Sequence, residues 1–272
     1  MRVFFYVTLV VLPLFLTACR ATQNYDDPAG PLFTGNYAET PPDFEGKIKL
    51  VSWNIPIADD LAPAIRELQQ VERLQNADFL LLQEMDEARA DEIARTLGYN
   101  YVYYPVSVNL KTGRNFGNAI LSRWPLSRPE KILLPYESPT NRQIRAVITA
   151  VADVAGRQIA LYSVHNETAV LSSSKRLQQT DTIVTQIGEG ADIVIAGGDF
   201  NAISQVGVAA LEERFATVGM ERVPTGATVI RLGQGFPADH IFLRGGEIVA
   251  GGAWAGTEAS DHFPVWVEML VE

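Results

Sequence analysis

The sequences GGDFN at residues 197–201 and SDHFP at residues 260–264 hold the densest groups of specific polar residues in the chain. Each adjoins an apolar run that predicts a strand, residues 193–196 before the first and residues 265–270 after the second. A sheet holds the backbone at the end of a strand while the emerging side chains remain accessible. We therefore expect both groups to lie at the edge of a sheet, where polar side chains can bind or react.

The rest of the chain alternates strand-like and helix-like segments. Runs of apolar and β-branched residues predict strands, and apolar residues at helical spacing predict helices. This alternation is typical of a single layered α/β or α+β domain. The expected strands are 48–55, 78–83, 101–104, 118–122, 146–151, 158–164, 193–196, 240–243 and 265–270, and the expected helices are 64–74, 88–97 and 172–187.

The N-terminus has the pattern of an export signal. Arg2 precedes an apolar run, residues 3–16, which is shorter than the roughly 20 residues of a membrane-spanning helix, so we expect residues 1–18 to be a signal peptide. Leu16-Thr17-Ala18-Cys19 resembles the bacterial lipobox, which implies cleavage before Cys19 and lipidation of Cys19. The alternative is an uncleaved membrane anchor. Because Arg20 follows the cysteine, the pattern resembles that of outer-membrane lipoproteins, facing the periplasm or the cell surface.

Composition then bounds the mature chain. Residues 19–46 are rich in Pro, Gly, Asn and Thr, so we expect a lipidated cysteine and a flexible tether there, followed by a domain over residues 47–272. Cys19 is the only cysteine of the sequence, so the domain has no internal disulfide. The net charge of −10 argues against an extended basic surface for nucleic acid, although Lys111, Arg114 and Arg142 could still gather at one face.

GGDFN and SDHFPV, together with SWN at residues 52–54 and QE at residues 83–84, resemble the endonuclease/exonuclease/phosphatase superfamily, which includes pancreatic deoxyribonuclease. The resemblance covers residues 47–272. It implies a four-layer α/β/β/α sandwich with two facing mixed sheets. It also implies hydrolysis of a phosphoester with a divalent metal, by in-line attack of water.

The resemblance assigns metal ligands. Glu84, Asn54 and Asp261 match the family positions at the metal, and their oxygen atoms suit Mg²⁺, with Mn²⁺ or Ca²⁺ as alternatives. A zinc site is not expected, because the histidines lack compact ligand spacing and the mature domain has no cysteine beyond Cys19.

The resemblance also assigns the catalytic groups. Asp199 would move the proton of the attacking water, and Asp239 would orient His262. His165, where the AP endonuclease branch carries tyrosine, is expected beside the phosphate, whereas His240 is expected to have no catalytic role. The expected phosphate-binding residues are Asn201, Arg145, His165 and His262, with Arg142 as a near competitor of Arg145.

Several possibilities remain open on sequence alone. The substrate could be nucleic acid, phospholipid or a sugar phosphate, and we expect a monomer. A different class of function is a noncatalytic binding module on the cell surface, for which we would expect the metal or histidine positions to be lost. They are all present.

Overall fold

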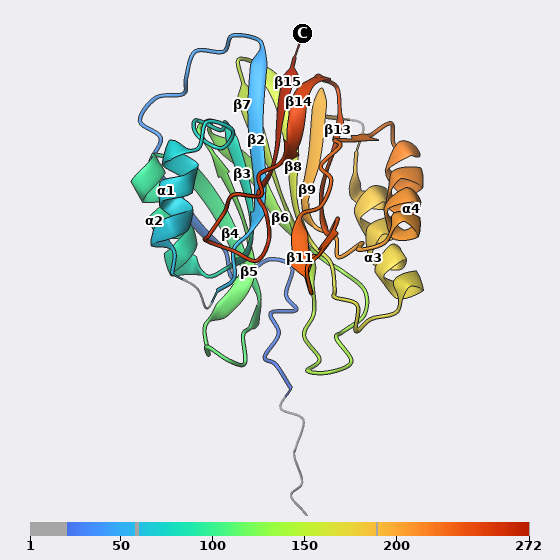
Figure 1. Cartoon of the computed structure of the whole chain (residues 1–272). Coiled ribbons are helices and arrows are strands. Elements are labelled where there is room, and N and C mark those ends of the chain that lie inside the picture. The colour runs from blue at the N-terminus through green and yellow to red at the C-terminus, as the bar shows by residue number, and fades with distance from the viewer. Residues whose placement is uncertain (1–20, 58–59, 189, 272) are drawn as a thin grey trace, which may run out of the picture.

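The computed structural model describes residues 21–271, apart from residues 58–59 and 189. Two mixed sheets face each other, and pairs of helices cover their outer faces (Figure 1). The first sheet has the order β1 (Phe33–Asn36), β4 (Asn100–Val108), β5 (Asn115–Ser122), β3 (Phe79–Met85), β2 (Lys47–Asn54), β15 (Val265–Leu270), β14 (Glu247–Ala253). The second has the order β10 (Glu221–Arg222), β13 (Asp239–Arg244), β9 (Ile193–Asp199), β8 (Arg157–His165), β7 (Ala146–Val154), β6 (Leu126–Leu133).

Four helices and one hairpin complete the described fold. Helices α1 (Ala62–Gln70) and α2 (Glu87–Leu97) lie on the first sheet, and α3 (Ser173–Gln186) and α4 (Gln205–Ala216) lie on the second (Figure 1). The hairpin is formed by β11 (Val229–Arg231) and β12 (Gln234–Phe236). None of the helices in residues 21–271 that the structure describes is both long and apolar enough to cross a membrane.

Three apolar cores hold the layers together. Along β3, Leu80 belongs to the core beneath α1 and α2, whereas Leu81 belongs to the core between the sheets, as expected from the alternation of side chains in a strand. Leu161 of β8 meets Leu81 in that central core. Phe242 packs in the third core, under α3 and α4. The predicted four-layer sandwich with two mixed sheets is confirmed.

Strand direction brings the polar ends of both sheets to one place. β2 runs parallel to β3 and β8 runs parallel to β9, so the carboxyl ends of the two strands in each pair lie at the same edge of their sheet. A hydrogen bond from Asn54 at the end of β2 to Asp199 at the end of β9 joins the two edges. We call this side of the sandwich, with the loops that lie there, the polar edge.

The N-terminal segment differs from the expected tether. From Ala21 onward the chain is docked on the domain, because β1 pairs with β4 and Phe33 packs against Tyr103 with ring centroids 5.9 Å apart. The expectation of a flexible tether over residues 19–46 is therefore wrong for its described part. Isolated aromatic residues without periodicity anchor the segment, which is why the sequence pattern gave no signal. The predicted signal peptide and the lipidation of Cys19 lie outside the described residues.

Most expected elements are present, but seven described elements were not anticipated: α4 and the strands β1, β6, β10, β11, β12 and β14. Helix α4 buries Val208, Leu211 and Phe215 at helical spacing, but it contains Gly207, which weakens a helical pattern. Only Lys131 is buried in strand β6, and β14 contains Gly251 followed by another glycine, so neither shows an apolar run. Strands β6 and β14 lie at the edges of their sheets.

Candidate active site

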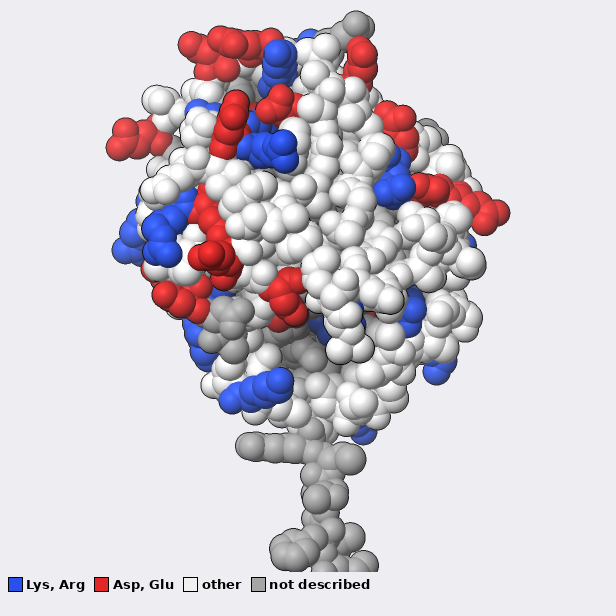
Figure 2. All heavy atoms as spheres, in the orientation of Figure 1, with Lys and Arg blue, Asp and Glu red and all other residues white. Residues whose placement is uncertain are grey.

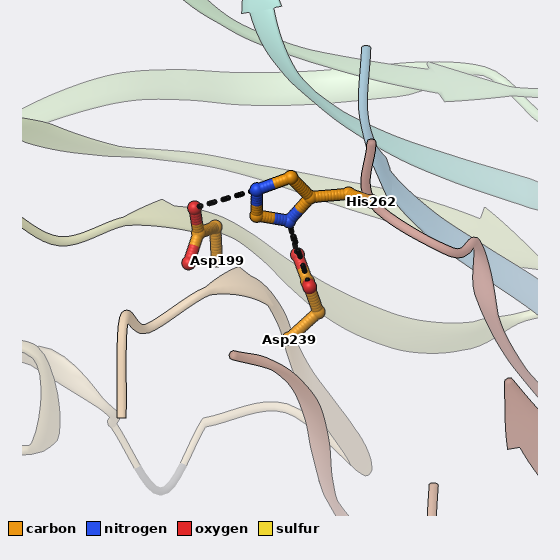
Figure 3. Close-up of side chains that lie close together, drawn as sticks. All are labelled: Asp199, Asp239 and His262. Atoms are coloured by element: carbon orange, nitrogen blue, oxygen red, sulfur yellow. Dashed lines mark hydrogen bonds and ion pairs between the residues drawn. The ribbon is translucent and has the colours of Figure 1, made fainter. Parts of the chain in front are cut away.

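His262 lies between two carboxylates at the polar edge. Its Nδ1 is 2.8 Å from Oδ2 of Asp239, and its Nε2 is 3.9 Å from Oδ2 of Asp199 (Figure 3). Asp199 ends β9 and Asp239 begins β13, and the two residues are directly paired across these strands. All three side chains are buried, and their ligand atoms lie within 4.8 Å of one another. The predicted pairing of Asp239 with His262 is thus present in the structure.

Burial and charge shift the proton affinities of this group. Burial disfavours the imidazolium of His262, but the carboxylates of Asp239 and Asp199 outweigh it and raise the pKa of His262 to about 10. Burial, together with the charge of Asp239, raises the pKa of Asp199 to about 7. The site can therefore hold a proton near neutral pH, either on the imidazole of His262 or on the carboxyl group of Asp199.

Two residues that the sequence did not suggest hold His262 and its partner. The hydroxyl of Thr228 donates to Oδ2 of Asp239 at 2.7 Å. The indole Nε1 of Trp53 donates to the backbone oxygen of His262 at 2.9 Å. Trp53 belongs to the SWN sequence, in which a role was predicted only for Asn54. Thr228 lies in a loop whose sequence, TGAT, does not indicate a role.

Asn54 and Glu84 form the part of the site suited to a cation. Glu84 has a φ of 60° at the point where the register between β3 and β5 shifts, so a local irregularity of the strand turns its side chain toward the end of β2. The amide nitrogen Nδ2 of Asn54 lies 3.4 Å from Oε1 of Glu84 and 3.2 Å from Oδ2 of Asp199. The amide oxygen Oδ1 of Asn54 is buried and has no hydrogen-bond partner.

This donor set fits a hard divalent cation. An orphaned buried oxygen is costly unless something binds it, and amide and carboxylate oxygens are the ligands that Mg²⁺ takes. Burial raises the pKa of the Glu84 carboxyl, and Arg145 only partly opposes this, so the carboxylate lacks full compensation by the protein. The nearby charge of Asp261, which is exposed, adds to the same effect. The structure thus brings Asn54 and Glu84 together, whereas Asp261 acts on Glu84 only through its charge.

His165 and Arg145 extend the site from the same oxygen of Asp199 that His262 approaches. Nε2 of His165 lies 3.7 Å from Oδ2 of Asp199, and Nη1 of Arg145 lies 3.0 Å from the same ring nitrogen. Burial, followed by the charges of Arg145 and His262, lowers the pKa of His165 well below 6.5, so His165 is neutral. Arg145 is held by Glu167 at 3.4 Å. The competing Arg142 is exposed and pairs with Glu137, outside this group.

Asn201 continues the site toward α3. Its backbone nitrogen donates to Oδ1 of Asp199 at 2.9 Å, and its Nδ2 donates to the backbone oxygen of Asn166 at 3.1 Å. It adopts a φ of 51°, a left-handed conformation that asparagine tolerates better than most residues. Asn201 thereby fixes both Asp199 and the loop that follows His165.

A cavity of about 120 Å³ opens beside Asn201, between α3 and α4. Its walls are mainly apolar, and Asn166 is one of the polar residues among them. The residues on its walls include Asn166, Arg176, Leu177, Phe200, Val206 and Leu211.

Beneath the site lies a polar network that sequence reasoning missed. Nε2 of Gln83 donates to Oγ of Ser163 at 3.1 Å, and Nδ2 of Asn118 donates to the backbone oxygens of Ala146 and Ser163. Each of these polar residues interrupts an otherwise apolar strand, which was the available signal. His240, in contrast, packs against Phe200 and Phe242, with ring centroids 6.0 and 6.3 Å away.

Comparisons with known proteins bear on the family and the fold. The model of the Endonuclease/Exonuclease/phosphatase family matches residues 51–262. A UPF0294 protein of Vibrio cholerae is 29% identical over 115 residues, covering 41% of this chain and 40% of that protein. A UPF0294 protein of Yersinia enterocolitica is 32% identical over 123 residues, covering 45% and 47%. These matches thus span less than half the length of the curated relatives.

Solved structures share the fold at lower identity. The endonuclease/exonuclease/phosphatase from Beutenbergia cavernae is 18% identical with a TM-score of 0.70, over 84% of this chain and 72% of that one. D. rerio TDP2 complexed with a single-strand DNA product is 21% identical with a TM-score of 0.66, over 83% and 99%. With the family model matching most of the sequence, this chain belongs to the endonuclease/exonuclease/phosphatase family.

Proposed function

We propose that this protein is an exported, lipid-anchored hydrolase that cleaves a phosphoester by in-line attack of water, with Mg²⁺ as its metal. The observation that carries the proposal is the position of His262 between Asp199 and Asp239, next to the unpaired Oδ1 of Asn54 and the carboxylate of Glu84. A phosphoester hydrolase needs a proton acceptor, cationic donors to phosphate and a cation site, and these residues supply each of them.

The protein's own side chains divide the work as follows. Asp199 accepts the proton of the attacking water, with Asn54 and Asn201 holding its two oxygens. His262 carries its proton on the Nε2 side, where it donates to a phosphate oxygen, and Asp239 keeps the ring oriented. Arg145, with His165 beside it, balances charge on the phosphate. Asn54, Glu84 and Asp261 would hold Mg²⁺, which when bound stabilises the negative charge that develops on the phosphate.

Two observations bear on the substrate. The likeness to D. rerio TDP2, solved with a single-strand DNA product, supports a nucleic acid. Acidic and basic side chains interleave on the face shown in Figure 2, and the net charge is −10, which weighs against a long polyanion gripped by a basic groove. Phospholipids and sugar phosphates therefore remain within the proposal.

The proposal is tested with purified protein and a panel of plasmid DNA, RNA, phospholipid, inositol phosphates and a chromogenic phosphodiester. We expect turnover of at least one substrate that EDTA abolishes and Mg²⁺ restores. Asp199→Ala and His262→Ala should each lower turnover by about 100-fold or more while the domain stays folded. Near-normal rates in both folded variants, or no hydrolysis with Mg²⁺, Mn²⁺ or Ca²⁺, would instead support a noncatalytic binding module.

The salt dependence separates the substrate classes. Hydrolysis of nucleic acid through several phosphate contacts should weaken steeply as salt rises, because binding releases counterions. Hydrolysis of a small or lipid phosphoester should change little. Export and anchoring are tested by labelling cells with a radioactive fatty acid and asking whether Cys19→Ser loses the label.

A further inference from the structure

Exposed apolar side chains are concentrated at the polar edge. Single exposed hydrophobic residues are ordinary on soluble domains, so only their placement is informative. Among the described residues, six of the nine large hydrophobic side chains that are exposed belong to loops, a hairpin or a helix start at this edge. They are Leu110, Tyr136, Val170, Val206, Ile230 and Leu232.

The sheet topology places these segments together. Because β5 is antiparallel to β3, the loop at residues 109–114 lies at the end of β3 that carries Glu84. Because β7 is antiparallel to β8, the loop at residues 134–145 lies at the end of β8. The β11–β12 hairpin starts at Val229, which forms a bridge with His262. The segments that carry the exposed side chains thus lie at the same edge as His262.

Two of these side chains are so exposed that packing within the domain does not explain why they are apolar. Leu232, at the turn of the β11–β12 hairpin, is fully exposed, and Val206 at the start of α4 is 82% exposed. Basic residues accompany them, since Lys111 is exposed beside Leu110, and Nζ of Lys175 lies 4.9 Å from the ring centroid of Tyr136. Leucine, tyrosine and lysine side chains together are typical of surfaces that enter the headgroup region of a bilayer.

The N-terminal segment reaches the domain at the same edge. The backbone nitrogen of Thr22 donates to the oxygen of Asn141 at 2.8 Å, and that of Val108 donates to the oxygen of Gln23 at 2.8 Å. The described chain therefore begins between the loops at residues 109–114 and 134–145 (Figure 1). The sequence before Ala21 holds the apolar run of residues 3–16 and Cys19. Two residues span roughly 7 Å at most, so an anchor at Cys19 would keep this edge near the membrane.

We propose that the polar edge docks on an anionic lipid bilayer, with the exposed apolar side chains in the headgroup region and the catalytic group facing the membrane surface. The inference rests on the proposed membrane attachment and deepens the proposed function, because the site would then act on phosphoesters presented at the bilayer. Lys111 and Lys175 match anionic headgroups in charge, and the chain that precedes Ala21 leads to the same surface.

Depth-dependent quenching tests the orientation directly. The full chain, carrying Leu232→Cys or Val249→Cys, is labelled with an environment-sensitive fluorophore and reconstituted into phosphatidylethanolamine/phosphatidylglycerol vesicles with brominated acyl chains. Val249 is a matched control, since it is an exposed apolar residue toward the opposite end of β14. The parent chain gives the background of labelling at Cys19. We expect brominated lipid to quench the label at position 232 at least twofold more than that at position 249.

Equal quenching at the two positions, or none at position 232, would overturn the docking. A response at position 232 that depends on protein density and not on bromination would also overturn it, because a second copy of the chain would then cover this surface. The measurement needs no enzymatic turnover. Selective quenching in a protein that hydrolyses no phosphoester would therefore support the docking while defeating the proposed function.

A double variant connects docking with turnover. Leu110→Asp with Leu232→Asp should reduce hydrolysis of phospholipid in vesicles about tenfold or more, while hydrolysis of a soluble chromogenic phosphodiester stays unchanged. Val249→Asp should change neither rate. An equal loss on both substrates, or no loss on vesicles, would contradict the docking.

Discussion

The hydroxyl of Thr228 donates to Oδ2 of Asp239, the same oxygen that lies 2.8 Å from Nδ1 of His262. The same hydroxyl oxygen accepts hydrogen bonds from the backbone nitrogens of Ala238 and Asp239, each at 2.9 Å. One buried side chain thus satisfies two backbone N–H groups at the start of β13 and holds the carboxylate that contacts the imidazole of His262.

Thr228→Val should therefore lower both stability and activity. Valine keeps the shape but leaves two buried N–H groups without a partner, which costs roughly 1–3 kcal/mol of unfolding free energy. Loss of the hydrogen bond to Asp239 should also lower kcat several-fold without a matching change in KM. Chemical denaturation and steady-state kinetics measure the two effects.

Thr228→Ser is the matched control, because it keeps the hydroxyl and removes only a methyl group. It should recover most of the activity that valine loses. If the serine variant is as slow as the valine variant, the hydroxyl is not what positions Asp239.

Gly198→Ala should destabilise the domain. A Cβ at position 198 would lie 1.9 Å from the backbone oxygen of Val164, on the neighbouring strand β8, so the parallel pairing of β8 and β9 would have to open. We expect a loss of about 3 kcal/mol or more, in the range of overpacked cores. Because the displaced strand ends at His165, the folded fraction should also lose activity.

Gly190→Ala provides the comparison, because a Cβ at position 190 would have only open space around it. Its melting temperature should stay within about 1 °C of the parent. Equal melting temperatures for the variants at positions 190 and 198 would show that the GGD sequence does not need its glycine for close strand approach.

Sequence reasoning identified the site residues because they stand out against apolar strands. Asp199 and His262 follow or precede continuous hydrophobic runs, which predicted a strand end for each, whereas their roles and their meeting at one edge were implied by the family resemblance. The local irregularity at Glu84 was invisible, since a φ of 60° in a strand depends on the register of the neighbouring β5. Only the assembled sheet shows why this glutamate turns toward Asn54.

The sequence could not predict contacts that isolated residues make in irregular segments. Thr228 and Lys131 are separated from their partners in sequence, and Nζ of Lys131 holds the N-terminal segment through the oxygens of Tyr25 and Gly30 at 2.9 and 2.8 Å. Such hydrogen bonds have no periodic signature. For that reason the sequence predicted a tether for the N-terminal segment, although its described part packs against the domain.

His240 should make stability depend on pH. Burial, followed by the charge of Arg222, lowers the pKa of His240 to about 4, against 6.5 for the unfolded chain. Between pH 4 and pH 6.5 the unfolded chain binds more protons at His240 than the folded protein does. The contribution of His240 to the free energy of unfolding is therefore fully present above pH 6.5 and is lost as the pH falls toward 4. A shift of this size corresponds to about 3 kcal/mol at most.

His240→Phe isolates the effect, because the ring already packs among Phe200 and Phe242 and phenylalanine does not titrate. Unfolding free energies of parent and variant, measured from pH 8 to pH 4, should diverge in favour of the variant as the pH falls. Parallel curves would mean that His240 is protonated as readily in the folded protein as in the unfolded chain.

Glu84→Gln should separate metal binding from folding. The charge of the half-buried Glu84 carboxylate destabilises the metal-free protein, since burial raises its pKa, so removing the charge should leave the metal-free melting temperature unchanged or higher. Binding of Mg²⁺ should weaken about tenfold or more, and the stabilisation that Mg²⁺ gives the parent should disappear, because only ligand binding to the folded state raises stability. Calorimetric titration and thermal melts with and without Mg²⁺ measure both effects. Glu92→Gln, on the exposed face of α2, should behave like the parent, and an unchanged Mg²⁺ affinity in Glu84→Gln would remove Glu84 from the cation site.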